Sequence, residues 1–313
     1  MADRIRLSLY CPTSLPGYHL PFLAAGANGL FAKFDLDVEI LEPAPGPANA
    51  ERVALGGADV CLTSVPHYLA ARTRSGDLAA RFFSILVRRS PLAGLVADGS
   101  DMAAPADLPG RRIGAPEGGE LLAEYQTGLA HLGLGPSQPV SMTYEEAPAA
   151  LGRGEIEVVA DFADLLPRTR RQAGIPLRAV PLCVEVYASG LVAADWLPDD
   201  LVLRIRQAVV VALAQHRADP TGVAAVEELE RRYPEVDPKE AQEGWSLVEP
   251  NIFTGEEPGS MTAERWEATL RFMTDAHGTL PPDPETVYRP ELAAVSTGAA
   301  ASRPHVSSAR PGA

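Results

Sequence analysis

The sequence contains few cysteines and no long apolar run. Three of its 313 residues are cysteines, and Cys11, Cys61 and Cys183 are scattered along the chain. Three scattered thiols are too few for a disulfide framework or a cysteine-based zinc site, so we expect reduced cysteines and no metal. The most apolar short stretch, residues 208–214, is far below the roughly 18 residues that a membrane span needs. We therefore expect no transmembrane segment.

Basic and aromatic residues are also scarce. The chain has 27 Lys and Arg against 41 Asp and Glu, which gives a formal net charge of −14. Binding to nucleic acid depends on neutralising phosphates with basic side chains, so we expect no nucleic-acid partner. An anionic membrane surface is disfavoured for the same reason. Aromatic residues make up 6% of the chain, which argues against a site built from several stacked rings.

The N-terminus lacks the pattern of a secretory leader. Ile5, Leu7 and Leu9 alternate with polar residues, as in a strand, and no basic segment precedes an apolar run. The sequence as written is therefore expected to be cytoplasmic. It is expected to be extracytoplasmic if a leader has been removed.

Residues 56–76 show the clearest local pattern. Residues 58–63 are β-rich and follow a Gly-Gly pair, which predicts a short buried strand. Ser64 then stands where a helix N-cap belongs, and Pro66 falls in the first helical turn. His67 is therefore expected just past the carboxyl end of a strand, where open α/β sheets bind ligands and where the helix dipole is positive. A histidine that only caps or packs the helix start is the alternative.

The rest of the chain alternates between short strands and helices as far as about residue 199. This alternation is typical of α/β proteins with parallel, doubly wound sheets. Residues 11–21 are too rich in Pro and Gly for a helix, so we predict a loop there, followed by a helix at residues 22–31. The other strands are predicted at residues 4–10, 36–41, 82–87, 92–96, 112–115, 140–143 and 157–161. Residues 177–181 and 183–192 are expected to carry the chain back to the first lobe, and a helical C-terminal part is predicted at residues 201–218, 221–232, 238–248 and 262–276.

A glycine pair, Gly118 and Gly119, precedes the predicted helix at residues 120–132. Such a pair can bind an anion through its backbone N–H groups. It has no lysine and no GxGxxG pattern, and Glu117 adds negative charge beside it. An ordinary turn is the alternative.

Four stretches match motifs of one superfamily, and they occur in the same order along the chain. Residues 26–41 (GANGLFAKFDLDVEIL) follow the pattern A-x-x-x-G-(Y/L)-F and then (G/D)-L-D-V, and residues 107–114 (DLPGRRIG) follow D-L-x-G-(K/R)-x-I-G. Residues 259–266 and 280–292 complete the set. In these stretches the sequence resembles solute-binding proteins for sulfonates, taurine and thiamine precursors.

This resemblance implies a periplasmic-binding-protein-like fold of type II. Two hinged α/β lobes with doubly wound sheets would hold a ligand in the cleft between them. The first lobe is expected to comprise residues 1–87 and 190–292, and the second residues 88–189. Residues 293–313 are small and polar, and we expect a disordered tail there.

Within the superfamily the sequence is most similar to the thiamine-pyrimidine (hydroxymethylpyrimidine phosphate) synthase and its bacterial binding-protein relatives. The similarity lies in residues 18–21 (YHLP), 40–43 (ILEP) and 66–71 (PHYLAA). In the synthase, the histidine that matches His67 is reactive, and a lysine four residues earlier binds pyridoxal phosphate. Thr63 stands at that lysine position here.

Two further parts of the synthase machinery are absent. Its cysteine-rich, iron-associated run maps near residues 182–187, where only Cys183 remains, and its phosphate loop maps to residues 117–120 (EGGE). The resemblance therefore implies a binding protein, with neither pyridoxal phosphate nor iron as a cofactor.

An aryl sulfinate desulfinase of the same fold gives a second enzymatic resemblance. Its nucleophilic cysteine lies at the end of the first strand, as Cys11 does here. A thiol at that place could be activated by a helix N-terminus or a nearby histidine. The desulfinase motif Arg-x-Gly-Gly is Ala54-Leu55-Gly56-Gly57 here, without the arginine.

We therefore expect an ABC-transporter-type substrate-binding protein for a small heteroaromatic ligand, a thiamine-related pyrimidine, with an ABC permease as its implied partner. A cytosolic enzyme on the same fold is the alternative, either synthase-like through His67 or a desulfinase-like C–S lyase through Cys11. An aromatic ring, hydrogen-bonding groups and carboxylates would suit an amino-pyrimidine. The candidate ligand-binding residues are Tyr18, His19, Thr63, Ser64, His67, Glu117, Gly118, Gly119, Asp161 and Glu185.

Overall fold

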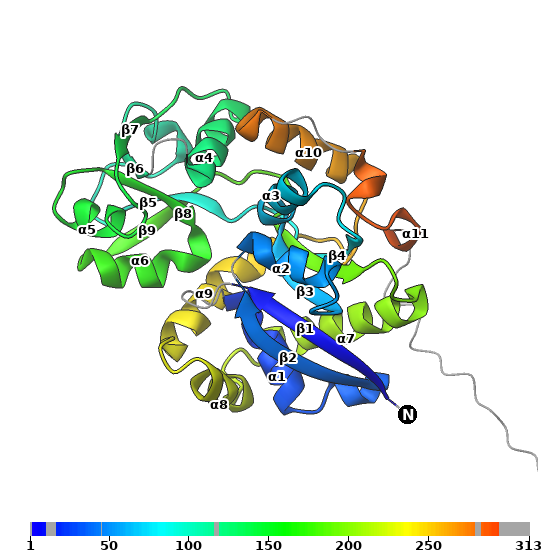
Figure 1. Cartoon of the computed structure of the whole chain (residues 1–313). Helices are drawn as coiled ribbons and strands as arrows, with labels where there is room; N and C mark the ends of the chain where they lie inside the picture. The colour runs from blue at the N-terminus through cyan, green and yellow to red at the C-terminus, as the bar shows by residue number, and fades with distance from the viewer. Residues whose placement is uncertain (1, 11–16, 45, 116–118, 279–282, 294–313) are drawn as a thin grey trace, which may run out of the picture.

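Two five-stranded sheets, each flanked by helices, form the protein (Figure 1). The computed structural model describes residues 2–10, 17–44, 46–115, 119–278 and 283–293. The first sheet has the strand order β2-β1-β3-β10-β4, and the second has the order β7-β6-β8-β5-β9. The strands are β1 (Asp3–Tyr10), β2 (Leu36–Ala44), β3 (Val60–Ser64), β4 (Ala80–Val87), β5 (Leu92–Ala97), β6 (Arg112–Ala115), β7 (Gln138–Ser141), β8 (Val158–Phe162), β9 (Leu177–Pro181) and β10 (Ser189–Ala194).

The helices of the second sheet come from the middle of the chain, and two C-terminal helices, α9 and α10, reach toward it from the first half. Helices α4, α5 and α6 surround the second sheet, α9 lies between the two halves of the molecule, and α10 runs along the top of the view from α4 past α3 (Figure 1). The α-helices are α1 (Leu20–Ala27), α2 (Gly46–Ala54), α3 (Val65–Ser75), α4 (Glu120–His131), α5 (Ala147–Gly152), α6 (Leu166–Ala173), α7 (Asp199–Ala218), α8 (Val223–Arg232), α9 (Pro238–Ile252), α10 (Ala263–His277) and α11 (Pro290–Ala293), and the 3₁₀ helices are η1 (Gly17–His19), η2 (Phe31–Phe34), η3 (Pro105–Asp107), η4 (Ala163–Leu165) and η5 (Pro284–Thr286).

All eight predicted strands are present, and the segments that return toward the first sheet add β9 and β10. The prediction of parallel sheets is wrong in part. Strand β10 runs antiparallel to β3 and β4, and β5 runs antiparallel to β8 and β9. The cause is the chain path. Strand β4 leads directly into β5 of the second sheet, and β10 returns to the first sheet between β3 and β4. The two strands that enter a sheet from the other one, β5 and β10, therefore run against its parallel strands.

The predicted loop and helix near the N-terminus also need correction. Helix α1 begins at Leu20, inside the predicted loop, because Pro21 is tolerated in a first helical turn. It ends at Ala27, and Gly29 at φ 63° turns the chain into η2 before the predicted end of the helix. Residues 11–16 of the predicted loop lie outside the described residues.

The predicted strand–corner–helix unit at residues 56–76 is confirmed. Strand β3 is fully buried, and the Ser64 Oγ accepts a hydrogen bond from the His67 backbone N–H at 3.3 Å. Pro66 lies in the first turn of α3, and Gly76 at φ 77° ends the helix. His67 therefore stands at the carboxyl edge of the first sheet.

The two sheets take their strands from different parts of the chain. The first sheet takes its strands from residues 3–87 and 189–194, and the second from residues 92–181. The lobe boundaries at 87/88 and 189/190 stay predictions. The C-terminal helices do not pack on the first sheet alone, since α10 contacts α4, and α9 contacts α6 and η4. Residues 294–313 of the predicted tail lie outside the described residues.

Among the described residues, none of the helices combines the length and the apolar character that crossing a bilayer requires.

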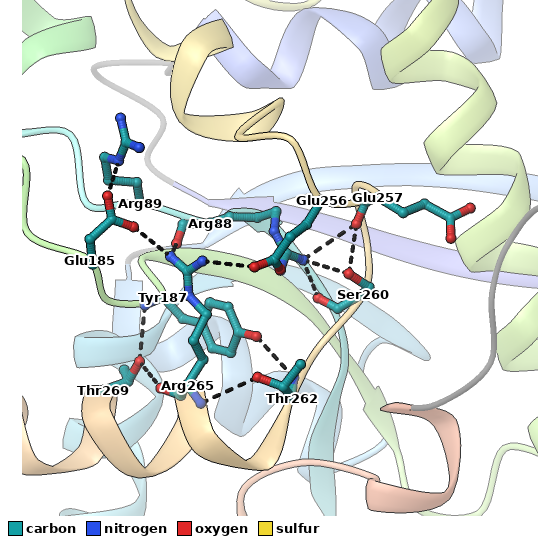
Figure 2. Close-up of polar contacts among 10 residues, drawn as sticks. All are labelled: Arg88, Arg89, Glu185, Tyr187, Glu256, Glu257, Ser260, Thr262, Arg265 and Thr269. Atoms are coloured by element: carbon teal, nitrogen blue, oxygen red, sulfur yellow. Dashed lines mark hydrogen bonds and ion pairs between the residues drawn. The ribbon is translucent and has the colours of Figure 1, made fainter.

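A network of charged side chains joins the two connections between the sheets (Figure 2). The connections run side by side, because the Ser90 backbone N–H donates to the Val184 carbonyl oxygen at 3.1 Å. Glu185 on one connection accepts hydrogen bonds from the Arg89 Nε at 2.6 Å and the Arg265 Nη2 at 3.1 Å. The network therefore ties both connections to helix α10.

Arg88 is the buried centre of this network. Its guanidinium donates to the Ser260 Oγ at 2.8 Å and to the Glu257 carbonyl oxygen at 3.4 Å, and it forms an ion pair with Glu256. The Arg88 side chain is 0% exposed, whereas that of Glu256 is 46% exposed. A charged group that is removed from water needs oxygen partners in the protein. The contacts of Arg88 therefore hold residues 256–260 against the first connection.

We expect Arg88→Met to destabilise the fold far more than Glu256→Gln. Loss of the guanidinium leaves buried carbonyl oxygens without a donor, which costs on the order of 3 kcal/mol. Glu256 is half-exposed, so water can take the place of its contact with Arg88. Glu256→Gln should therefore lower the free energy of unfolding by less than about 1 kcal/mol. Denaturant midpoints of the two variants measure the difference. Equal losses of stability would show that Arg88 is not the centre of the network.

Candidate functional site

A cavity of about 530 Å³ lies where the two sheets face each other. Its walls include Ser64 and Val87 at the ends of β3 and β4, and Ser189 at the start of β10. Asp161 and Phe162, at the end of β8, line it from the second sheet. The carboxyl ends of parallel strands are where open α/β sheets bind ligands, so both sheets present their usual binding edge to one space.

Aromatic side chains supply much of the apolar lining. Tyr18, Tyr144, Phe162 and Tyr187 line the cavity together with aliphatic residues. The Tyr18 hydroxyl lies 3.4 Å from the Ser189 Oγ, which joins η1 to the first sheet. Tyr144 is 41% exposed, so it lies where the cavity opens to solvent. A planar ligand could contact ring faces or edges from both sheets.

His67 lines the cavity in its neutral form near neutral pH. Burial lowers the pKa of this imidazole, and the negative charge of Glu120 opposes the shift only in part. The first turn of α3 favours the neutral ring as well, because the helix dipole is positive there. His67 can therefore donate one hydrogen bond to a ligand and accept another.

Two aspartates of the cavity, Asp161 in β8 and Asp164 in η4, have carboxyl groups with raised pKa values. Burial raises the pKa of Asp161 to about 6, although the Phe162 backbone N–H at 2.8 Å and the Thr169 Oγ1 at 3.0 Å donate to its carboxylate. Burial and the nearby charge of Asp161 raise the pKa of Asp164 to about 7. Asp164 is 6% exposed and lies in η4.

The described lining of the cavity is acidic. Arg168 is its one arginine or lysine, and it lies on α6. Glu124 is 5% exposed, and burial raises its pKa; its Oε1 lies 3.4 Å from the His277 Nε2 on α10. That contact raises the pKa of His277. The carboxyl groups in the lining are those of Glu120, Glu124, Glu145, Asp161 and Asp164.

Helix α9 packs against η4, which carries the cavity residues Asp164 and Leu165. A Cβ atom at Gly244 would lie 2.7 Å from the Asp164 carbonyl oxygen, and one at Gly17 would lie 2.0 Å from the Trp245 backbone nitrogen. The absence of a side chain at these positions allows three backbones to meet. Residues of α6 and α9 form ion pairs beside this contact, with the Arg170 Nη1 at 3.0 Å from the Glu243 Oε1 and the Arg171 Nε at 2.6 Å from the Glu240 Oε1.

Four candidates from the sequence line the cavity: Tyr18, Ser64, His67 and Asp161. Their role as ligand contacts stays a prediction.

Four others lie elsewhere. Thr63 and His19 are 0% exposed and do not line the cavity, and burial lowers the pKa of His19 to about 3. Gly119 is the N-cap of α4. Glu185 belongs to the network in Figure 2 rather than to the cavity, because Arg89 and Arg265 draw it to the connections. Cys11, Glu117 and Gly118 lie outside the described residues.

The main residues missed from the sequence are Asp164, Glu124, Arg168 and Ser189. A signal for Asp164 was present, since Asp161 and Asp164 stand three residues apart directly after a predicted strand. Glu124 gave no such signal, because its partner His277 is distant in the sequence and meets it only through the packing of α4 on α10.

The family model described as NMT1/THI5 like matches residues 17–222 of the chain. No curated protein sequence is significantly similar to it. Among solved structures, the aliphatic sulphonate-binding protein SsuA of Escherichia coli is similar over 92% of each chain, at 15% identity and a TM-score of 0.68. SsuA of Xanthomonas axonopodis pv. citri bound to MOPS covers 92% of this chain and 99% of its own, at 16% identity and a TM-score of 0.60.

A DszB mutant in complex with biphenyl-2-sulfinic acid is similar too, over 94% of this chain and 98% of its own, at 15% identity and a TM-score of 0.57. At these identities the likeness is one of fold. The expected two-lobed, periplasmic-binding-protein-like α/β fold is confirmed.

We expect Asp164→Asn to stabilise the ligand-free protein at about pH 8 and to change little at about pH 4. The raised pKa of Asp164 means that the folded state holds its proton more tightly than the unfolded state, whose carboxyl has a pKa near 3.9. The free energy of unfolding that depends on this group therefore falls as pH rises from about 4 to about 7. The amide avoids the charge, so the gain at the higher pH is on the order of 3 kcal/mol.

Denaturant midpoints at the two pH values measure the effect. Glu145→Gln, at an exposed position of the same cavity, is the matched control and should change little at either pH. A variant Asp164→Asn that is less stable than the parent at about pH 8 would contradict the assignment.

Proposed function

The chain belongs to the NMT1/THI5-like family, and we propose that it is a substrate-binding protein of the ABC-import type for a small heteroaromatic ligand. The observation that carries the proposal is the cavity of about 530 Å³ between two sheets that two side-by-side segments of the chain connect. That volume is in the range of small-molecule sites. Connections of this kind permit hinge closure around a ligand.

The chemistry of the lining supports a thiamine-related pyrimidine as the ligand. A pyrimidine ring can contact Tyr18, Tyr187 and Phe162, and its amino group can donate to Asp161. His67 and Ser64 can bond to ring nitrogens or a hydroxymethyl group, because both offer a donor and an acceptor. The two SsuA neighbours are named for sulfonates, but a sulfonate here would face five carboxyl groups with Arg168 as its one arginine or lysine partner among the described lining.

The residues do not fit the cofactors of the family's synthase. Thr63 is fully buried outside the cavity, and a threonine cannot form the Schiff base that pyridoxal phosphate requires of an amine. Cys183 is an isolated exposed thiol, and the described residues contain no cluster of His, Cys, Asp and Glu that could hold a metal ion. We therefore propose a function without pyridoxal phosphate or iron.

The enzymatic alternatives depend on different residues. A synthase-like reaction would use His67, which lines the cavity, and a desulfinase-like reaction would use Cys11, which lies outside the described residues. Binding requires neither group to react. An ABC permease as partner and an extracytoplasmic location belong to the proposal for the importer.

We expect pyrimidines to raise the melting temperature of the protein clearly. The panel to be tested contains amino-pyrimidines, formylaminopyrimidine, pyridoxal phosphate, taurine, and aryl sulfonates and sulfinates, and only the pyrimidines are expected to give a shift. A ligand at about 100 times its dissociation constant stabilises the folded state by roughly 2.7 kcal/mol. Differential scanning fluorimetry measures the shift.

The same samples separate a binder from an enzyme. After incubation, mass spectrometry should recover both the ligand and the protein with unchanged masses. A shift with aryl sulfonates alone would refute the pyrimidine ligand, whereas conversion of the ligand, or a loss of mass in the peptide that contains His67, would refute the binding role.

A further inference from the structure

We propose that Asp164 sets the charge class of the ligand by accepting hydrogen bonds from a cationic, amidine-type group, so that the site selects cations over anions. In such a group an amino nitrogen stands next to a protonated ring nitrogen, and both N–H groups point the same way. The inference rests on the proposed function and deepens it, since it names the form in which the ligand binds.

The first observation is a buried carboxylate oxygen without a partner. Within the described residues, the Asp164 Oδ1 is buried and has no hydrogen-bond partner, and the residue is 94% buried and lines the cavity. Asp161 differs, because the Phe162 N–H and the Thr169 hydroxyl both donate to it. A buried acceptor without a hydrogen bond destabilises the folded protein. A ligand that donates a hydrogen bond to this oxygen would remove that penalty, which favours binding.

The second observation is the charge around Asp164. Asp161 on β8 is the neighbouring charge that raises the pKa of Asp164. Arg168 on α6 lines the cavity and acts on the Asp161 carboxyl group. On the side of α9, Glu240 and Glu243 are paired with Arg171 and Arg170. A cationic ligand would reduce the repulsion between the two aspartates, whereas an anion would add to it.

The third observation is that the backbone of Asp164 is held in place. The close approach of Gly244 leaves no room for η4 to shift toward α9, because even a Cβ atom would lie 2.7 Å from the Asp164 carbonyl oxygen. A carboxylate on a rigid support can recognise a planar donor pair bidentately. Asp164 is therefore suited to select the ligand rather than to adapt to it.

Titration of Asp164 gives the inference a second readout. Burial and Asp161 raise the pKa of Asp164 to about 7. A permanent cation binds the ionised carboxylate, so its affinity should rise about tenfold between about pH 6 and about pH 8. Glu120, Glu124 and His67 also face the cavity, but they approach it from α4 and α3 rather than from the side of η4.

The test compares benzamidine with benzenesulfonate, which carry opposite charges on the same ring. Isothermal titration calorimetry of the full chain should show tighter binding of benzamidine. Asp164→Asn should weaken benzamidine binding by about 10- to 150-fold, the range expected for a lost hydrogen bond to a charged group. Glu230→Gln, at an exposed position on α8 that does not line the cavity, should change it by less than about twofold.

Tighter binding of benzenesulfonate, no binding of benzamidine, or equal benzamidine affinity in the parent protein and Asp164→Asn would each overturn the inference. The pH profile of the parent protein tests it without any variant, and a flat profile would overturn it too. If benzamidine binds through Asp164 but no pyrimidine stabilises the protein, the inference stands and the pyrimidine ligand falls. If a pyrimidine binds equally well to Asp164→Asn, the proposed function stands and the inference falls.

Discussion

The contact between α9 and η4 is the constraint that holds the backbone of Asp164 in place at the cavity. Gly244 meets the backbone of Asp164 where no side chain would fit, and Gly17 meets the backbone of Trp245 in the same way. Ion pairs between α6 and α9 flank this contact. Because α9 also reaches the connections through hydrogen bonds from Arg88 and Arg89 to the Asn251 carbonyl oxygen, one helix links closure of the cavity to the connections between the sheets.

The buried carboxyl groups of the cavity have an electrostatic cost that explains the character of the site. Burial raises the pKa of Asp161, Asp164 and Glu124. A protein gains no stability from such groups, and binding sites commonly retain them at the expense of stability. In this chain the carboxyl groups are best explained as partners for a ligand that brings N–H donors or positive charge into the cavity.

Local sequence patterns were sufficient for the strands and for the unit that carries His67. The order Gly-Gly, β-rich segment, Ser64 and Pro66 predicts β3, the N-cap and α3 because each feature acts within a few residues. Antiparallel β5 and β10 could not be read in the same way, since strand direction depends on where the chain crosses between the sheets. Glu185 resembled a cleft residue in sequence, but its position is set by Arg89 and Arg265, and Arg265 is distant in the chain.

The central claim is that the two lobes close on a ligand, with α9 against η4. Small-angle X-ray scattering with and without the best-stabilising ligand tests it most directly, and Gly244→Leu is the matched control because its side chain would collide with the Asp164 backbone. The account predicts a smaller radius of gyration for the parent protein when ligand is bound, and no such decrease for Gly244→Leu. An unchanged radius of gyration for the parent protein at saturating ligand would contradict it.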